Sequence, residues 1–115
     1  MREAEWVKEF PGAVTVCDSE GRIVAMNDRA AEVFADGGGG ALVGRNVLDC
    51  HPEQARSRLR DMLESGLANV YTIEKNGRRK LIYQSPWYRG GKYAGLVELA
   101  LEIPREMPHF NRDQG

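Results

Sequence analysis

Hydrophobic and polar residues alternate along residues 93–103, where only Gly95 interrupts the pattern. The apolar positions are Tyr93, Val97, Leu99, Leu101 and Ile103. The positions on the opposite face are Ala94, Leu96, Glu98, Ala100 and Glu102. A period of two residues is typical of a β-strand with two different faces. Because a long apolar strand at a sheet edge promotes aggregation, we expect this strand to lie in the centre of a sheet.

The two faces of this strand are expected to meet different surroundings. The apolar face, with Val97 and Leu99, should line the interior of the domain. Leu96 and Ala100, on the mixed face, are then expected on the outer surface of the sheet, open to a partner protein.

Further segments have the composition and alternation of β-strands. They are residues 13–17, 22–26, 69–75 and 79–88. A turn with Gly21 joins the first two, and Asn76 and Gly77, a strong hairpin signal, join the next two. Pro86 has no backbone N–H, so we expect it at a bulge or facing an open edge.

Helical spacing of apolar residues predicts short helices at the start and in the middle of the chain. They cover residues 3–10, 29–34 and 52–65, with short helical turns at residues 42–48. Pro11 ends the first helix. Asn27 or Asp28 caps the second, and Pro52 begins the third, where its missing N–H costs nothing.

The order of elements is two strands, a block of short helices and three strands. Pairing neighbours, and joining the first strand to the fifth, gives a five-stranded antiparallel sheet in the order 2-1-5-4-3. The helices lie over one face, so the fold class is α+β. We expect residues 1–11 to form an N-terminal amphipathic helix, residues 12–104 the domain, and residues 105–115 an irregular tail.

Composition and charge exclude several classes of protein. A chain of 115 residues can bury a single hydrophobic core. Its 16 basic and 17 acidic residues nearly cancel, and we interpret Arg78, Arg79 and Lys80 as solvated strand-end charge, so no nucleic-acid partner is expected. Cys17 and Cys50 make no disulfide framework. Without a signal-peptide pattern or a membrane-spanning run, we expect a cytoplasmic protein with no membrane partner.

This order of elements, with the residues that separate them, resembles a PAS domain. Residues 18–27 look like the opening hairpin of that family, and residues 27–34 look like its following helix. Residues 42–46 look like the turn after that helix, and residues 95–98 match the start of the last strand. The resemblance covers about residues 10–103 and implies a sensory domain whose sheet curves around a cavity.

Cys50, His51 and Pro52, before the third helix, resemble a subset of bacterial PAS domains. Two departures from the family also matter. Pro104 stands where PAS modules that drive kinases usually continue towards a coiled helix, and proline breaks that exit. The sequence around Cys50 does not match the flavin-photosensor signature, so flavin is not expected.

The resemblance implies a ligand cavity between the sheet and the helices. Candidate wall residues are Val14, Val16, Ile23, Phe34, Leu48, Leu59, Leu63, Tyr83, Trp87, Val97 and Leu99. Most of them are expected to be ordinary core. Tyr83 and Trp87 are stronger candidates because their polar atoms need partners when buried. The residues that we select as ligand-binding are His51, Cys50, Phe34, Tyr83, Trp87 and Val97.

The identity of the cofactor stays open at this stage. His51 stands in a region from which haem-binding relatives offer an axial ligand, and a neutral imidazole binds iron well. The alternative is that His51 stabilises the start of the helix. A metal site at Asp49, Cys50, His51 and Glu53 has less support, because adjacent residues rarely converge on one ion. Cys50 near a helix start is also a candidate redox-sensitive thiolate.

We expect a sensory and signalling module that binds a small ligand or cofactor and acts through protein association. The alternatives are a ligand-free dimerisation domain and a haem or redox sensor that uses His51 and Cys50. Trp6, Val7 and Phe10 are the predicted contacts of a homodimer. The sequence contains no hydrolase or metalloprotease motif, so we expect no enzyme.

Overall fold

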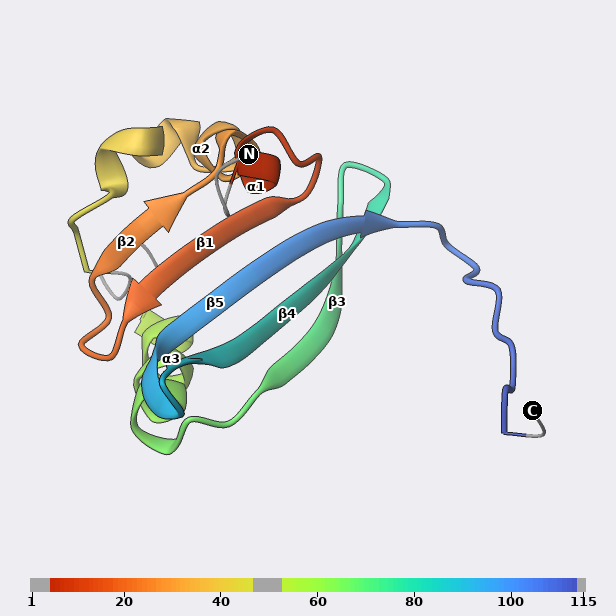
Figure 1. Ribbon diagram of the computed structural model, residues 1–115. Helices are drawn as coiled ribbons and strands as arrows, with labels where there is room; N and C mark the ends of the chain where they lie inside the picture. Colours follow the sequence, from red (N-terminus) through yellow and green to blue (C-terminus); the bar gives the residue numbers. More distant parts are fainter. Residues whose placement is uncertain (1–4, 47–52, 114–115) are drawn as a thin grey trace.

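The computed structural model describes residues 5–46 and 53–113 of the chain. These residues form a curved antiparallel sheet with short helices (Figure 1). The helices are α1 (Glu5–Lys8), α2 (Asp28–Val33) and α3 (Glu53–Ser65), with 3-10 turns η1 (Ala35–Gly37) and η2 (Gly39–Leu42). The strands are β1 (Ala13–Asp18), β2 (Ile23–Met26), β3 (Asn69–Lys75), β4 (Arg78–Arg89) and β5 (Lys92–Ile103).

The strand order β2-β1-β5-β4-β3 confirms the predicted topology. The long alternating strand β5 lies in the centre, as its pattern predicted. It pairs with β1 from Ala13↔Ala100 to Asp18↔Gly95, and with β4 along nearly its whole length. Both of its edges are therefore covered, which leaves the shorter β2 and β3 as the edge strands.

The prediction of which face of β5 points inward was wrong. Leu96 is only 5% exposed and packs with Cys17 of β1 and Met62 of α3. Because side chains alternate along a strand, Val97 and Leu99 point to the opposite face, and both are half-buried. The mixed face of β5 is thus the inner face, which the helices cover, and the more apolar face is the outer one.

The register extends this assignment across the sheet. Leu99 pairs with Val14 on β1 and Tyr83 on β4, so these side chains share the outer face. In the same way, Glu98 pairs with Thr15 and Gln84 on the inner face. From Leu96 onwards, β5 therefore has one face towards the helices and one away from them, whereas Tyr93, before the kink at Gly95, donates to the carbonyl oxygen of Leu63 on α3 at 3.0 Å.

Asn27 holds the start of the domain together. Its side-chain oxygen caps α2 by accepting from Ala30 N at 3.0 Å, and it also accepts from Val14 N at 3.0 Å. Its amide nitrogen donates to the carbonyl oxygens of Val7 at 3.0 Å and Gly12 at 2.8 Å. One buried side chain thus joins α1, β1 and α2, which fulfils its predicted capping role and adds two connections to it.

Several boundaries differ from the predicted ones. The described part of α1 ends at Lys8 rather than at residue 10, because Pro11 has no N–H to donate to the carbonyl of Val7, which accepts from Asn27 instead. Strand β4 runs through Pro86, which lies beyond the last pair with β3 and one residue before a register shift at Trp87 and Tyr88. Of the two expected placements of Pro86, the bulge lies one residue further on, whereas the position past the last pair with β3 agrees with the expectation of an open edge. Beyond β5 the chain extends away from the sheet without regular structure (Figure 1).

Candidate functional site

A row of polar side chains crosses the inner face of the sheet. Asn69 Nδ2 on β3 donates to Gln84 Oε1 on β4 at 3.1 Å, and Gln84 Nε2 donates to Glu98 Oε2 on β5 at 2.6 Å. Thr15, the cross-strand neighbour of Glu98, continues the row onto β1. Gln84 is only 5% exposed, so the row lies inside the fold. Buried polar groups need partners, and here they find them in one another.

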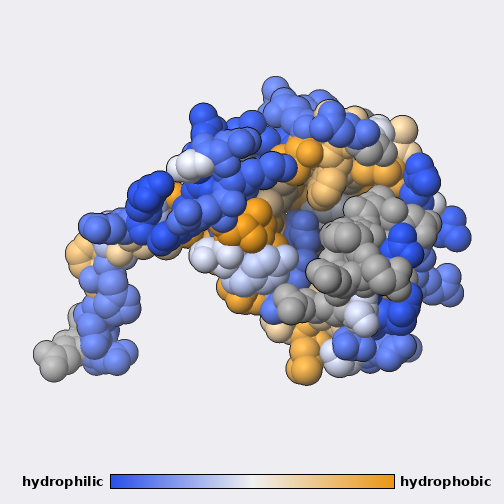
Figure 2. All heavy atoms as spheres, turned by 180° about the vertical axis from the view of Figure 1, so that it is seen from behind, coloured by the Kyte–Doolittle hydropathy of each residue, from blue (hydrophilic) through white to orange (hydrophobic). Residues whose placement is uncertain are grey.

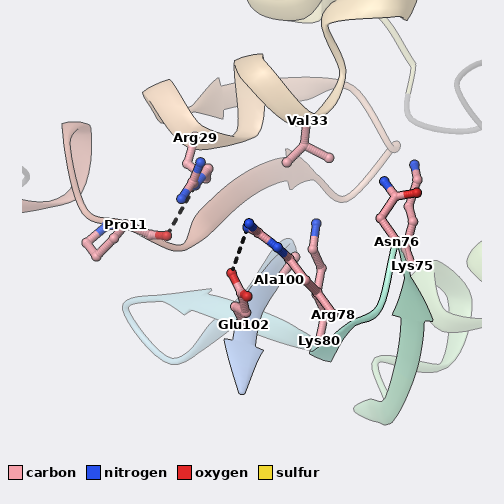
Figure 3. A pocket seen from close by; sticks show the side chains of 9 residues that line it. All are labelled: Pro11, Arg29, Val33, Lys75, Asn76, Arg78, Lys80, Ala100 and Glu102. Atoms are coloured by element: carbon pink, nitrogen blue, oxygen red, sulfur yellow. Dashed lines mark hydrogen bonds and ion pairs between the residues drawn. The ribbon is translucent and has the colours of Figure 1, made fainter. Parts of the chain in front are cut away.

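Next to this row, a cleft of about 460 Å³ opens between α2, the β3–β4 turn and the end of β5 (Figure 3). Its lining residues are Pro11, Arg29, Val33, Lys75, Asn76, Arg78, Lys80, Ala100 and Glu102. Four of them are cations and one is a carboxylate, so their formal charges sum to +3 (4 − 1), whereas the whole chain carries −1. We call this site the cationic cleft.

Two cations of the cleft are held by neighbouring groups. Arg29 donates from Nε to the carbonyl oxygen of Pro11 at 3.3 Å and from a terminal nitrogen to Glu32 at 3.2 Å. Arg78 faces the carboxylate of Glu102 at 3.5 Å, and Figure 3 shows these two side chains extending towards each other. Both arginines are therefore oriented at the rim of the cleft.

The two lysines of the cleft differ from the arginines. Lys80 and Lys75 project from β4 and β3 on the inner face, where Lys80 is the cross-strand neighbour of Glu102. Among the residues that the structure describes, no carboxylate lies within ion-pair distance of either ammonium group. Within the part of the chain that the structure describes, no acidic side chain forms an ion pair with either lysine, so the cleft keeps positive charge that is not neutralised at short range.

Figure 2 shows the molecule from behind, with a hollow beside a strongly hydrophilic part of the surface and hydrophobic atoms above and to the left of it. The apolar members of the cleft lining are Val33 of α2, Ala100 of β5 and Pro11. Six of the nine lining residues are polar or charged, so the cleft is more polar than most small-molecule sites, whose walls are mainly apolar.

Trp87, one of the selected ligand-binding residues, has a structural partner. Its indole nitrogen donates to the carbonyl oxygen of Cys17 at 2.9 Å, although β5 separates the two strands. Gly95, which pairs with Trp87, has no side chain in the way of this bond. This hydrogen bond of Trp87 connects β4 to β1 near α3. The indole nitrogen thus has a hydrogen-bond partner, as we expected if it were buried.

The other selected ligand-binding residues fall in different places. Tyr83, 41% exposed, and Val97 lie on the outer face of the sheet, because the inward face was assigned wrongly, and neither lines the cationic cleft. Phe34 is half-buried at the end of α2. Cys50 and His51 lie outside the described residues.

The described part of the inner face does not fit haem well. Haem needs largely apolar walls, whereas Thr15, Gln84 and Glu98 cross this face and cations line its mouth. The proposed axial ligand His51 lies outside the described ranges, and so do Asp49 and Cys50, which with His51 and Glu53 made up the candidate metal group. Within those ranges, no group of three or more histidine, cysteine, aspartate or glutamate residues could hold a metal ion.

The thiol of Cys17 is not suited to redox chemistry. Burial against Leu96 and Met62 raises its pKa above the ordinary value of a cysteine. A thiol with a raised pKa is protonated at neutral pH, and the protonated form is a poor nucleophile. Cys17 therefore serves as part of the core.

The predicted dimer contacts of α1 are largely exposed. Trp6 is 59% exposed and Phe10 is 36% exposed, and their rings meet edge to face with centroids 5.9 Å apart. Val7 is half-buried. The side chains of Phe10 and Leu101 both lie close over Gly12, so this aromatic pair continues the outer apolar face of the sheet.

Sequence reasoning interpreted Arg78 and Lys80 as solvated strand-end charge and did not connect them with Lys75 or Arg29. Lys75, Arg78 and Lys80 flank a predicted hairpin turn at spacings that place them on one face of a β3–β4 pair. That alternation could have indicated from the sequence that these three cations lie on one face. Arg29 gave no such signal, since only the tertiary fold brings α2 over this end of the sheet.

Comparisons with known proteins agree with this architecture. A family model described as PAS fold matches residues 7–104. No curated protein sequence matches the chain. None of the described helices combines the length and the apolar character needed to cross a membrane.

Solved structures share the fold at low sequence identity. The PAS domain of BvgS from Bordetella pertussis has a TM-score of 0.61 and 22% identity, covering 86% of this chain and 82% of that one. A C-terminal domain from Streptococcus mutans has a TM-score of 0.70 and 19% identity, covering 84% and 79%. The Aer2 receptor of Vibrio cholerae, described as a dual PAS-heme oxygen sensor, has a TM-score of 0.60 and 16% identity, covering 81% and 95%.

Proposed function

This chain belongs to the PAS fold family, and on that premise we propose that it binds a small ligand on its inner face and signals by self-association through its outer face. PAS domains are typically sensory or signalling modules, and they commonly mediate contacts between proteins. The role that we propose is one of binding and association rather than catalysis.

One observation carries this proposal, namely the distribution of side chains between the two faces of the sheet. The face beneath the helices bears the polar row of Asn69, Gln84 and Glu98. The face away from the helices bears apolar side chains, with Val97 and Leu99 at its centre. A domain that only needed a stable core would favour the reverse arrangement.

The outer face has the properties of a protein contact surface. Its apolar members are Val14, Val16, Val70, Leu81, Tyr83, Val97, Leu99 and Leu101. Contiguous apolar surface of this kind marks interaction sites in soluble domains. We propose a second copy of this chain as the occupant, because the centre of the face carries no charge that would select a different partner. A two-fold axis through Leu99 would bring equal apolar surfaces together.

The exposed ring pair of α1 supports the same partner. Trp6 and Phe10 extend the apolar face beyond Leu101, and aromatic residues are enriched in protein interfaces. In this proposal Trp6, Val7 and Phe10 border the contact, and the centre of the sheet supplies most of its apolar area.

For the ligand, we propose a colourless small molecule rather than haem or flavin. The polar inner face and the cationic cleft support this choice, since both offer hydrogen bonds and charge where haem needs apolar walls. The oxygen-sensing role of Aer2 belongs to that receptor.

Leu99→Glu tests the association. It should lower the dimer affinity by about tenfold or more, because a carboxylate would have to be desolvated at the centre of the contact. Sedimentation velocity over a range of concentrations measures this change. The matched control is Val43→Glu, which adds the same charge at an exposed apolar residue outside the sheet and should leave the affinity unchanged.

If Leu99→Glu lowers the stability of the fold, Tyr83→Glu tests the same contact. Tyr83 is more exposed on the same face, so a charge there disturbs the fold less. A wild-type chain that stays monomeric at millimolar concentration would overturn the proposed self-association. Equal effects of the outer-face variants and Val43→Glu would do the same.

A further inference from the structure

We propose that the cationic cleft binds a small organic anion, whose acidic group lies against Lys80 and Arg78 and whose apolar part lies against Val33 and Ala100. This inference rests on the proposed function, since it names the class of ligand that the sensory module would detect.

The charge of the cleft favours an anion. The lining contributes Arg29, Lys75, Arg78 and Lys80 against the single carboxylate of Glu102, which already faces Arg78 at 3.5 Å. Like charges gathered around one open cleft repel each other, and water screens this repulsion in part, because the side chains of Arg29 and Arg78 are 48% and 67% exposed. A bound anion would relieve that repulsion, whereas a cationic ligand would increase it.

Lys80 is the strongest single indication. It is half-buried, and among the described residues it has no carboxylate within ion-pair distance, although Glu102 is its cross-strand neighbour. Figure 3 shows its side chain directed into the space between Arg78 and α2. Because the residue is half-buried, its aliphatic stem holds the ammonium group at the cleft, where a bound anion would pair with it.

The size and walls of the cleft favour an organic anion over a bare inorganic one. Its volume of about 460 Å³ lies within the range of small-molecule sites. Val33 and Ala100 offer apolar contact on opposite sides, one from α2 and one from β5 (Figure 3). An inorganic phosphate would use the cations but leave these apolar walls without a partner.

The test is a titration of the full chain followed by ¹H–¹⁵N NMR. The probes are benzoate, phenyl phosphate and inorganic phosphate. Benzoate or phenyl phosphate should give saturable shifts at the amides of Val33, Lys80 and Ala100, and inorganic phosphate should bind more weakly. These probes separate a carboxylate preference from a phosphate preference while sharing the same cationic contacts.

A matched pair of variants locates the binding. Lys80→Gln should lower the affinity for the probe by about tenfold, because it removes a charge-assisted hydrogen bond. Arg79→Gln removes the same formal charge from the adjacent position on the outer face, where Arg79 contacts Glu74 and the carbonyl of Arg105. The control should bind the probe as the wild type does.

The outcomes are distinct. No saturable shift with any probe at millimolar concentration, or equal weakening by Arg79→Gln, would overturn the proposal. Binding of an acidic peptide but of none of the probes would overturn the small-molecule class. Sedimentation of the Lys80→Gln chain distinguishes a failure of anion binding from a failure of the proposed self-association. If only anion binding is lost, the chain should still self-associate through the outer face.

Discussion

Replacing Gly95 with alanine is expected to lower the free energy of unfolding by about 3 kcal/mol or more. Gly95 has a φ of +144°, which side-chain-bearing residues rarely adopt. A Cβ at this position would overlap the carbonyl oxygen of Cys17 and lie 2.7 Å from the carbonyl carbon of Asp18. Strand β1 would have to move away from β5, and the bond from Trp87 to Cys17 would be disturbed with it. Urea unfolding followed by circular dichroism measures the loss.

Gly40→Ala is the matched control for this change. Gly40 lies in η2, and a Cβ there would meet no atom within 4 Å. Its φ is outside the left-handed region. The control should change the free energy of unfolding by no more than about 0.5 kcal/mol. If both variants unfolded at the same urea concentration, the close approach of β1 and β5 at Gly95 would be refuted.

Asn27→Ala is expected to destabilise the protein by about 3 kcal/mol, because it removes a helix cap and leaves several buried backbone groups without a partner. The side-chain oxygen now accepts from Val14 and Ala30, and the amide donates to the carbonyls of Val7, Phe10 and Gly12. Amide exchange should also rise at residues 7–12, which lose their connection to α2. Urea unfolding and hydrogen exchange check the two effects.

Two further variants test whether the hydrogen bonds of Asn27 cause this loss of stability. Asn27→Asp keeps the accepting oxygen but turns a carboxylate towards three carbonyl oxygens, so it should destabilise at least as much as alanine. Asn111→Ala, in the exposed tail, should have almost no effect. Stability near that of the wild type for Asn27→Asp would contradict the assigned network.

The sequence predicted the strands and their order because each signal is local. Asn76 and Gly77 both adopt positive φ, as their hairpin turn requires, and β3 has the predicted bounds. Gly21 has the positive φ that the first turn was expected to need. These residues have strong intrinsic preferences, so neighbouring sequence suffices to place the turns and hence the strand pairs.

The faces of the sheet could not be predicted in the same way. Alternation along β5 separates Leu96 from Val97, but it does not say which side the helices cover. The more apolar side was the natural choice for the interior. In the structure, Gln84 and Glu98 are accommodated inside because they bond to each other, and that pairing depends on a register between distant strands.

The residues of the candidate site also differ in whether the sequence alone could predict them. The basic residues around the β3–β4 turn share a face by simple alternation, so Lys75, Arg78 and Lys80 were within reach of sequence reasoning. The contribution of Arg29 and Val33 requires α2 to cross that end of the sheet. The selected pair Cys50 and His51 lies outside the described residues, and its role stays a prediction.

The central claim is that the apolar outer face is a contact between two copies of the chain. An isotope-filtered NOE measurement on a mixture of methyl-labelled and unlabelled protein tests it most directly. We expect intermolecular cross-peaks to the methyl groups of Val97, Leu99 and Leu101. Intermolecular cross-peaks confined to other surfaces, or none at millimolar concentration, would contradict it.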